Sequence, residues 1–199
     1  MFFASISSCL DQFADCDVSL LFSQELGEKN VEARSLNNLG MLAQATGKCE
    51  EARKLYQKSL EIKHQLGDKS GVSSSLHNLG MLAQKAGEYE EAQRLYQQSL
   101  KISQELHNKE GESKSLHNLG ALAQATGKYE EARRLFQKSL KISQDIGYKI
   151  GIGATQAQLA LLEEKIGNVK EALQLIIQAE AAFRDLGSPD AKLAGEVRQ

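Results

Sequence analysis

The sequence has 199 residues, which is enough for one domain or for a short array of repeats. Its net charge is only −2, and Lys and Arg are scattered among Asp and Glu, so the charge pattern excludes a strongly basic surface for nucleic acid. Trp is absent, there is one Pro, and Ala, Leu, Glu, Gln and Lys are abundant, a composition that favours an all-helical protein.

The first segment, residues 1–35, is predicted to be a partial, degenerate repeat. Its opening stretch MFFASISSCL is apolar but has no basic region, so no signal peptide is predicted. Helical spacing of apolar residues predicts a helix over about 8–26, and Leu26-Gly27 resembles a helix end with a left-handed Gly cap. Cys9, Cys16 and Cys49 form no CxxC pair, which predicts a reducing, cytoplasmic compartment.

Repetition begins at SLNNLG, from Ser35, and continues as SLHNLG from Ser75 and from Ser115, each copy forty residues after the last. Three full repeats are therefore predicted over 36–75, 76–115 and 116–155, followed by a diverged fourth over 156–187. Residues 188–199 are predicted to form a terminal helix, because Ser188-Pro189 suits a helix start. No stretch of 18 apolar residues exists, so no membrane span is expected.

Each repeat is predicted to form two helices. In the second repeat one apolar stripe joins Leu76, Leu79, Leu82 and Ala83, and Gly87 ends the helix. The residues expected to be buried in the next helix are Tyr89, Ala92, Leu95, Tyr96, Leu100 and Ile102. Left-handed caps are predicted at Gly47, Gly67, Gly87, Gly127, Gly147, Gly167 and Gly187, with His107 in place of one Gly, and Asp68 and Asn108 are predicted N-caps. Because a helix pair cannot bury its apolar face alone, the pairs are expected to stack.

This pattern resembles the tetratricopeptide repeat. Leu-x-x-Leu-Gly-x-x-Ala at 76–83, followed by Gly87-x-Tyr89-x-x-Ala92-x-x-x-Tyr96, recurs in register, and the match covers about 19–187. The forty-residue period is similar to the variety in kinesin light chain, in Leu-Gly-Asn spindle adaptors and in sensor regions of STAND-type ATPases. The resemblance implies an all-α solenoid, a right-handed superhelix with peptide segments held in its concave groove. Small residues at Gly40 and Ala52 suit a close approach of the paired helices.

Candidate chemistry is sparse. His77 and His117 occupy equivalent positions in neighbouring repeats, where stacking would place them roughly 10 Å apart, too far to share a metal. We therefore read them as exposed groove residues. The Glu pairs that open the second helices suit the helix dipole, as in Glu90-Glu91. No phosphate-binding loop and no catalytic triad can be assembled. We expect no enzyme activity, catalytic residue, cofactor or metal.

The candidate binding site is the inner face of the first helices, which the resemblance places on the concave surface. Residues at steps of three and four share that face. They are Arg34, Asn37, Asn38, Met41, Gln44, His77, Asn78, Met81, Gln84, Lys85, Lys114, His117, Asn118 and Gln124.

Two interpretations stay open for the recurring Asn at 38, 78 and 118. In relatives with Asn at this position it holds the backbone of an extended peptide, and the alternative is that each Asn bonds its neighbouring repeat. Met41 and Met81 either contact the ligand or belong to the core. Arg34, Lys85 and Lys114 lie at non-equivalent positions, which argues against a clamp for a C-terminal carboxylate.

The function expected from the sequence is a non-catalytic scaffold that binds a peptide or protein segment in the concave groove. The alternative is a fragment, sensor or oligomerisation region of a larger regulator, such as a STAND-type ATPase, because the sequence opens inside a repeat. Self-association through the exposed ends of the array is also expected, since arrays need polar caps. No nucleic-acid or membrane partner is expected.

Overall fold

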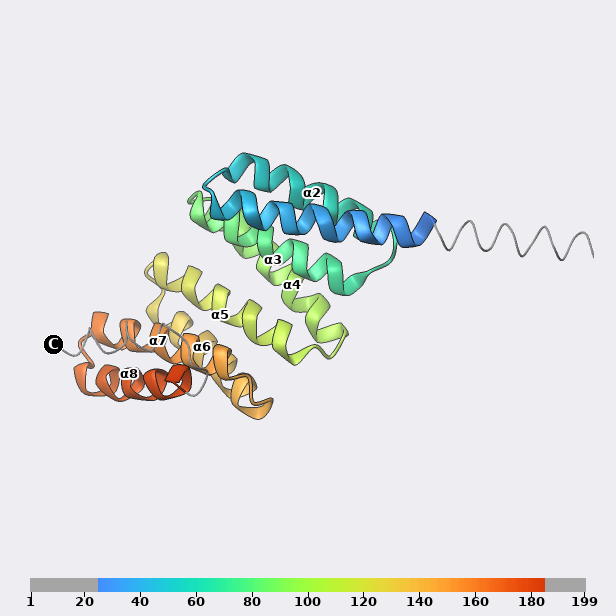
Figure 1. Cartoon of the computed structure of the whole chain (residues 1–199). Coiled ribbons are helices and arrows are strands. Elements are labelled where there is room, and N and C mark those ends of the chain that lie inside the picture. The colour runs from blue at the N-terminus through green and yellow to red at the C-terminus, as the bar shows by residue number, and fades with distance from the viewer. Residues whose placement is uncertain (1–24, 185–199) are drawn as a thin grey trace, which may run out of the picture. The chain divides into compact units, whose positions relative to one another are not determined.

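The structure is a computed structural model, and it describes residues 25–184. Over this range the chain forms eight helices and no strand (Figure 1), so the predicted all-α class is confirmed. A first helix covers 25–45. It is followed by α2 (Cys49–Gln65), α3 (Lys69–Lys85), α4 (Tyr89–Glu105), α5 (Lys109–Ala125), α6 (Tyr129–Asp145), α7 (Lys149–Lys165) and α8 (Val169–Arg184). Gly187, the terminal helix and all but the last two residues of the helix predicted over 8–26 lie outside the described residues.

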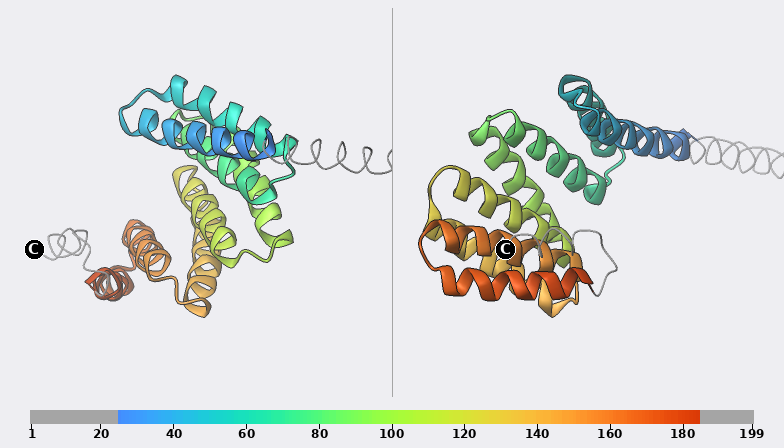
Figure 2. Two further views of the ribbon diagram at one scale, coloured as in Figure 1. Left: turned by 45° about the vertical axis from the view of Figure 1, so that its right-hand side comes forward. Right: turned by 60° about the vertical axis from the view of Figure 1, so that its left-hand side comes forward.

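The chain divides into two compact units, one ending at Gly71 and one beginning at Val72. In the first unit the helix over 25–45 pairs with α2. In the second unit three antiparallel pairs follow one another, α3 with α4, α5 with α6 and α7 with α8 (Figure 2). Within this unit α4 packs on α5, α6 packs on α7, and the first helices α5 and α7 touch. The predicted stacking of helix pairs is therefore confirmed there.

A glycine in each of the first three pairs lets the two helices approach closely. A Cβ atom built on Gly40 would lie 2.6 Å from the Tyr56 ring, and one on Gly80 would lie 2.6 Å from the Tyr96 ring. In the third pair the ring of Phe136 occupies the same place beside Gly120. All three rings are fully buried, as is Ala52. The predicted close approach at Gly40 and Ala52 is confirmed, and it explains a Gly that costs a helix interior about 1 kcal/mol relative to Ala.

The buried Tyr hydroxyls are hydrogen-bonded to a Gln one helical turn beyond the glycine. Tyr56 Oη donates to Gln44 Oε1 at 2.9 Å, and Tyr96 Oη donates to Gln84 Oε1 at the same distance. Phe136 has no hydroxyl to offer, and the corresponding Gln124 Oε1 is buried without a hydrogen-bond partner. The change from Tyr to Phe in this repeat thus leaves the Gln124 carbonyl oxygen without a hydrogen-bond donor.

The helix ends follow the predicted glycine pattern with one correction. Six of the predicted glycines have positive φ, at 47, 67, 87, 127, 147 and 167. His107 adopts φ 53° in place of a Gly, as predicted. The predicted N-caps are also confirmed, since Asp68 and Asn108 accept hydrogen bonds from the backbone N–H of Gly71 and Gly111.

The predicted break at Leu26-Gly27 is wrong, because the first helix runs through both residues. Glu28 stands where Asp68 and Asn108 cap the next helices, and Glu is not an N-cap residue. Instead, an ion pair joins Glu25 and Lys29, which lie one helical turn apart on either side of Leu26-Gly27, with 3.0 Å between Oε1 and Nζ. This pair supports a continuous helix.

Buried serines pack between the two helices of the α3–α4 and α5–α6 pairs, a feature that the apolar pattern did not show. In the α3–α4 pair Ser73 Oγ lies 3.0 Å from Ser99 Oγ and 3.1 Å from Ser103 Oγ, all buried. The α5–α6 pair repeats this cluster with Ser113, Ser139 and Ser143. Among the residues predicted to be buried in α4, Ala92, Leu95 and Tyr96 are buried.

For three other positions in α4 the prediction of full burial is wrong. Tyr89 is exposed, while Leu100 and Ile102 are only partly buried. Ser99 and Ser103, which the apolar pattern did not mark, are buried in this helix instead.

We predict that Gly120→Ala destabilises the second unit although Ala is the better helix former. The new methyl group would lie 2.8 Å from the Phe136 ring, and forcing it into this packed site should cost about 1–3 kcal/mol in the free energy of unfolding, measured by urea titration. Gly27→Ala is the matched control, because Gly27 is helical with nothing within 4 Å. It should stabilise the protein slightly, and equal effects at the two glycines would contradict the packing argument.

We also predict that Phe136→Tyr stabilises the second unit by about 1 kcal/mol, the net value of one hydrogen bond. The new hydroxyl should meet the orphan Gln124 Oε1 as Tyr96 meets Gln84. The free energy of unfolding should be measured for Phe136→Tyr in the natural background and in Gln124→Met. The gain should vanish in the Met background, and a gain that persists there would exclude this hydrogen bond as its source.

Candidate functional site

The candidate site is a small cavity on the inner face of the second unit. Its volume is about 170 Å³, and side chains of three successive first helices, α3, α5 and α7, line it together with Tyr148. The predicted groove residues that meet here are His77, Met81, Lys114, His117 and Asn118. Ile150, Ala154 and Thr155 of α7 complete the wall.

His77 is held by contacts on two sides. Its ring centroid lies 5.8 Å from that of Tyr96, and Asn118 Nδ2 lies 3.3 Å from its Nε2. An amide nitrogen can only donate, so Nε2 accepts and the ring carries its proton on Nδ1. Burial lowers the pKa of His77 to about 4, with further lowering by the positive charge of Lys114 and by His117. His77 is therefore neutral at pH 7.

His117 repeats this arrangement one pair further on. Its ring lies 5.5 Å from that of Phe136, and its Nδ1 lies 3.0 Å from Thr155 Oγ1 of α7. Burial lowers the pKa of His117 as well. The interpretation of both histidines as exposed residues is wrong, because each is partly buried. His77 packs on Tyr96, the ring that contacts Gly80, and His117 packs on Phe136, the ring that contacts Gly120.

The Asn118 contact bears on the two interpretations of the recurring Asn. Asn118 lies on α5 and His77 on α3, so the bond joins neighbouring repeats as the structural alternative requires. His117 and Thr155 join α5 to α7 in the same way. This polar network does not exclude peptide contact, because Nδ2 carries two hydrogens and one bond to His77 uses one of them.

Lys114 provides the positive charge of the cavity. Its Nζ lies 2.5 Å from Glu110 Oε1 and 5.4 Å from the centre of the Tyr148 ring. Burial acts to lower the pKa of Lys114, but the hydrogen bond to Glu110 and the neighbouring Tyr148 hold it above its ordinary value. A fixed cation thus stands beside two neutral imidazoles.

The remaining predicted residues are distributed differently. Gln44 and Gln84 use their side-chain carbonyls to hold the buried Tyr hydroxyls. Lys85 and Gln124 do not line the cavity. The other predicted residues belong to the first unit: Arg34, Asn37, Asn38, Met41 and Gln44. There Met41 is exposed, and Asn37 Nδ2 lies 3.8 Å from its sulfur, so Met41 is not a core residue of that unit.

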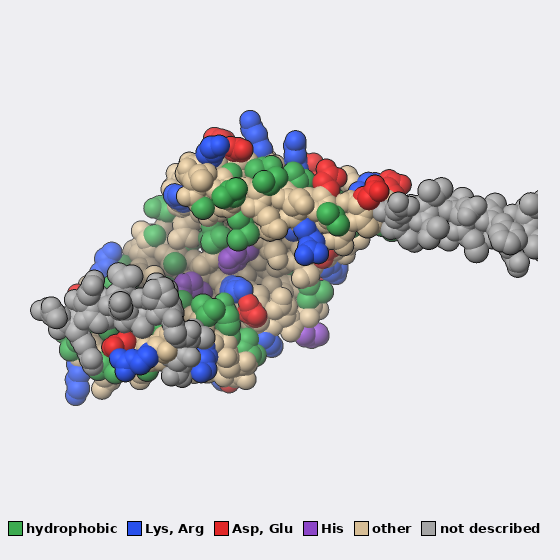
Figure 3. Space-filling model, in the orientation of Figure 1, with side chains coloured by type: hydrophobic (Ala, Val, Ile, Leu, Met, Phe, Trp, Pro, Cys, Tyr) green, Lys and Arg blue, Asp and Glu red, His purple; other side chains and the backbone are tan. Residues whose placement is uncertain are grey.

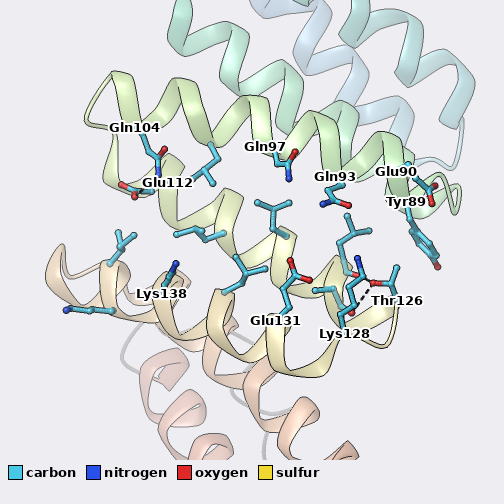
Figure 4. Close-up of a pocket in the computed structure, with 18 residues that line it drawn as sticks. Tyr89, Glu90, Gln93, Gln97, Gln104, Glu112, Thr126, Lys128, Glu131 and Lys138 are labelled. Carbon is cyan, nitrogen blue, oxygen red and sulfur yellow. Dashed lines mark hydrogen bonds between the residues drawn. The ribbon is translucent and has the colours of Figure 1, made fainter.

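A second, larger groove of about 720 Å³ lies between the second helices α4 and α6, above α5 (Figure 4). Leu116, Leu119 and Leu122 form its floor. Gln93 and Gln97 line one side and Glu131 and Lys138 the other. Sequence reasoning missed this groove, because the apolar stripe of α5 indicates a buried face and not how far the flanking helices stand apart.

Within residues 25–184 no three His, Cys, Asp or Glu side chains are grouped to hold a metal ion. Charges on the face shown in Figure 3 are mixed, with no broad patch of one sign in view. None of the described helices combines the length and the apolar character needed to cross a membrane.

Comparison with known proteins agrees with this architecture. The family model described as "Tetratricopeptide repeat" matches residues 19–65, 31–105, 71–145 and 111–185. The chain belongs to the tetratricopeptide repeat family. No curated protein matches the sequence.

Several solved structures have a similar fold. BtubC from P. vanneervenii is 20% identical with a TM-score of 0.71, over 85% of this chain and 69% of that one. A putative kinesin light chain with nearly identical repeats from Podosopora anserina is 24% identical with a TM-score of 0.65, over 83% and 82%. Aspartyl phosphate phosphatase F from Bacillus subtilis is 12% identical with a TM-score of 0.76, over 82% of this chain and 43% of that one.

The family assignment fixes the general role of the chain. Tetratricopeptide repeats form scaffolds for protein–protein interaction, so the partners are proteins. Repeats of this family are generally non-catalytic.

We predict that acid destabilises the second unit through His77. The folded pKa of about 4 lies below the ordinary value of 6.5, so the unfolded chain binds the proton more readily. Stability should be complete above about pH 6.5 and fall as the pH decreases toward 4, with a loss of about 2 kcal/mol at pH 5. The free energy of unfolding at pH 7 and pH 5 measures this loss.

The matched variant is His77→Asn, which installs the residue found at the equivalent Asn37. It should lose less stability between pH 7 and pH 5 than the natural protein. The control His107→Asn changes an exposed histidine at a helix end and should leave the pH dependence as it is. An unchanged pH profile in His77→Asn would rule out His77 as the source.

Proposed function

We propose that this tetratricopeptide repeat chain binds an extended peptide segment on the inner face of its second unit, with one apolar side chain of the peptide in the cavity between α3, α5 and α7. The observation that carries the proposal is the meeting of side chains from three successive first helices around one cavity. A segment lying across the repeats would contact all three helices.

The size and lining of the cavity favour an apolar anchor. A cavity of about 150 Å³ is large enough for benzene, so about 170 Å³ suits one side chain such as Leu or Phe. Met81, Ile150 and Ala154 supply apolar walls, and Met adapts to different shapes. The neutral imidazole of His117 adds a flat surface that carries no charge to repel an apolar group.

Polar groups at the rim suit the backbone of the same segment. Asn118 has a second amide hydrogen after its bond to His77, and amide groups match the carbonyls of an extended peptide. Lys114 stands at the edge of the cavity with its charge partly balanced by Glu110, so it favours a carbonyl or an acidic neighbour of the anchor over a basic one.

The role of Asn38, Asn78 and Asn118 as one continuous peptide-binding column stays a prediction. The alternative role as a sensor or oligomerisation region of a larger STAND-type regulator also stays a prediction.

The proposal is tested by selecting peptides from a random display library on the whole chain and measuring their dissociation constants. Ile150→Glu places a charge at the cavity, and the exposed position of Ile150 should leave the fold intact. We expect selected peptides to share an apolar residue and to bind this variant at least about tenfold more weakly, a change of about 1.4 kcal/mol.

The matched control is Gln97→Lys, which changes the rim of the groove between α4 and α6. Its affinity for the selected peptides should equal that of the natural chain. Peptides that lose affinity for Gln97→Lys and keep it for Ile150→Glu would move the binding site to that groove and overturn the proposal. Circular dichroism of both variants checks that each is folded.

A further inference from the structure

An uncovered apolar surface lies on the first helix, in the first unit. We call it the head face, formed by the exposed Leu39 and Leu42 and the partly buried Leu36. Leu39 is 51% exposed and Leu42 is 62% exposed, and within the described residues of this unit no side chain covers them. These values are high for leucines that belong to the repeat signature.

The same positions are buried in the repeats that follow. On α5 the equivalents Leu119 and Leu122 are buried and lie beside the residues of α4, the second helix of the preceding pair. On α7 Leu159 and Leu162 are buried in a cluster with Ala132 and Phe136 of the preceding pair. The head face therefore has the residues of a joint between repeats, and within residues 25–71 no helix covers it as α4 covers α5.

A second uncovered surface lies on α8, in the second unit. We call it the tail face, formed by Val169, Leu173 and Ile177 at steps of four. Leu173 is 48% exposed and Ile177 is 46% exposed. Eighty residues earlier, the same positions on α4 are Tyr89, Gln93 and Gln97, which line the groove between α4 and α6 above α5. The tail face is thus the part of a second helix that turns toward the next repeat.

We propose that the head face of one copy receives the tail face of a second copy, in the geometry that α4 uses on α5. The occupant is a second copy because the chain itself carries both halves of the joint in matching register. The sequence of the head face, LNNLGMLAQATGK, also differs little from LHNLGALAQATGK on α5, which already accepts a second helix.

The chemistry at the centre of the joint supports this pairing. At the α6–α7 joint this position holds an ion pair, with Arg133 Nε 2.7 Å from Glu163 Oε1. At the proposed joint the equivalent residues are Leu173, which is exposed, and Ala43, which is already buried within its own unit. Both are apolar, so this position of the joint carries no charge. Burying the leucines on both sides is the driving force.

Joining a head to a tail is a heterologous contact, so it does not close into a symmetric dimer. Copies would add in series as a ring or an open filament. The contact leaves the inner face of α3, α5 and α7 unused, so the proposal does not rest on peptide binding.

The test uses the full chain in sedimentation velocity over a range of concentrations. The head variant carries Leu39→Lys and Leu42→Lys, and the tail variant carries Leu173→Lys and Ile177→Lys, all at exposed positions. The natural chain should grow in mass with concentration, and each variant alone should stay a monomer. An equimolar mixture should give a dimer with twice the monomer mass and nothing larger, because each variant keeps one intact face.

The control Ile146→Lys changes an exposed residue between α6 and α7, and it should associate like the natural chain. A natural chain that stays a monomer at the highest concentration would overturn the proposal. Association that persists in only one of the two variants would replace it with a symmetric contact, head to head or tail to tail. Melting curves of all variants confirm folding.

Discussion

The contact between a helical glycine and an aromatic ring is the constraint on which both the fold and the candidate site depend. Gly80 gives up its side chain so that the Tyr96 ring can lie against the backbone of α3, and burial raises the pKa of that Tyr. The ring then needs a partner for its hydroxyl, which Gln84 supplies. It also presents a surface on which His77 rests. The position of His77, and of the Asn118 amide that bonds to it, therefore follows from the packing of the core.

His77 therefore has two roles at once, one in packing on Tyr96 and one in the hydrogen bond to the neighbouring repeat. As a neutral ring it covers Tyr96 and accepts the bond from Asn118 of the neighbouring repeat. A protonated His77 would turn a second donor toward the Asn118 amide, next to the positive Lys114. The same protonation that weakens the stack would therefore disturb the wall of the cavity. Stability and the shape of the cavity are coupled here through one proton.

The repeat period predicted the helix pairs, their left-handed caps and the close approach at glycine, because each rests on local sequence and on a pattern that recurs. The same pattern predicted which residues lie on the inner face but not how deeply each is buried. Spacing shows which side of a helix a residue faces and not what packs over it. His77 and His117 were read as exposed for this reason. The serine clusters were missed because Ser has no apolar signal, and Gly27 was misread because its cap depends on Glu28.

Near-identical repeats raise the problem of register, since a slip by one repeat would preserve most of the Leu and Gly contacts. The α6–α7 joint carries a feature that the other joints lack. Glu163 is 1% exposed, and the residues at its equivalent positions in the earlier repeats are Ala43, Ala83 and Ala123. Burial alone would raise its pKa, but hydrogen bonds from Arg133 and Asn168 hold the pKa of Glu163 below its ordinary value.

A slip by one repeat would set α4 on α7 and bring Gln93 to the position of Arg133. Glu163 would then be a buried carboxylate without its cation, which costs about 3–5 kcal/mol when one partner of such a pair is lost. The unslipped pair contributes little net stability of its own, because burying two charges offsets most of their attraction. Its effect is to destabilise an arrangement in which α7 packs on a helix other than α6. In an array whose packing residues are almost the same in every repeat, this charged joint makes α6 the stable neighbour of α7.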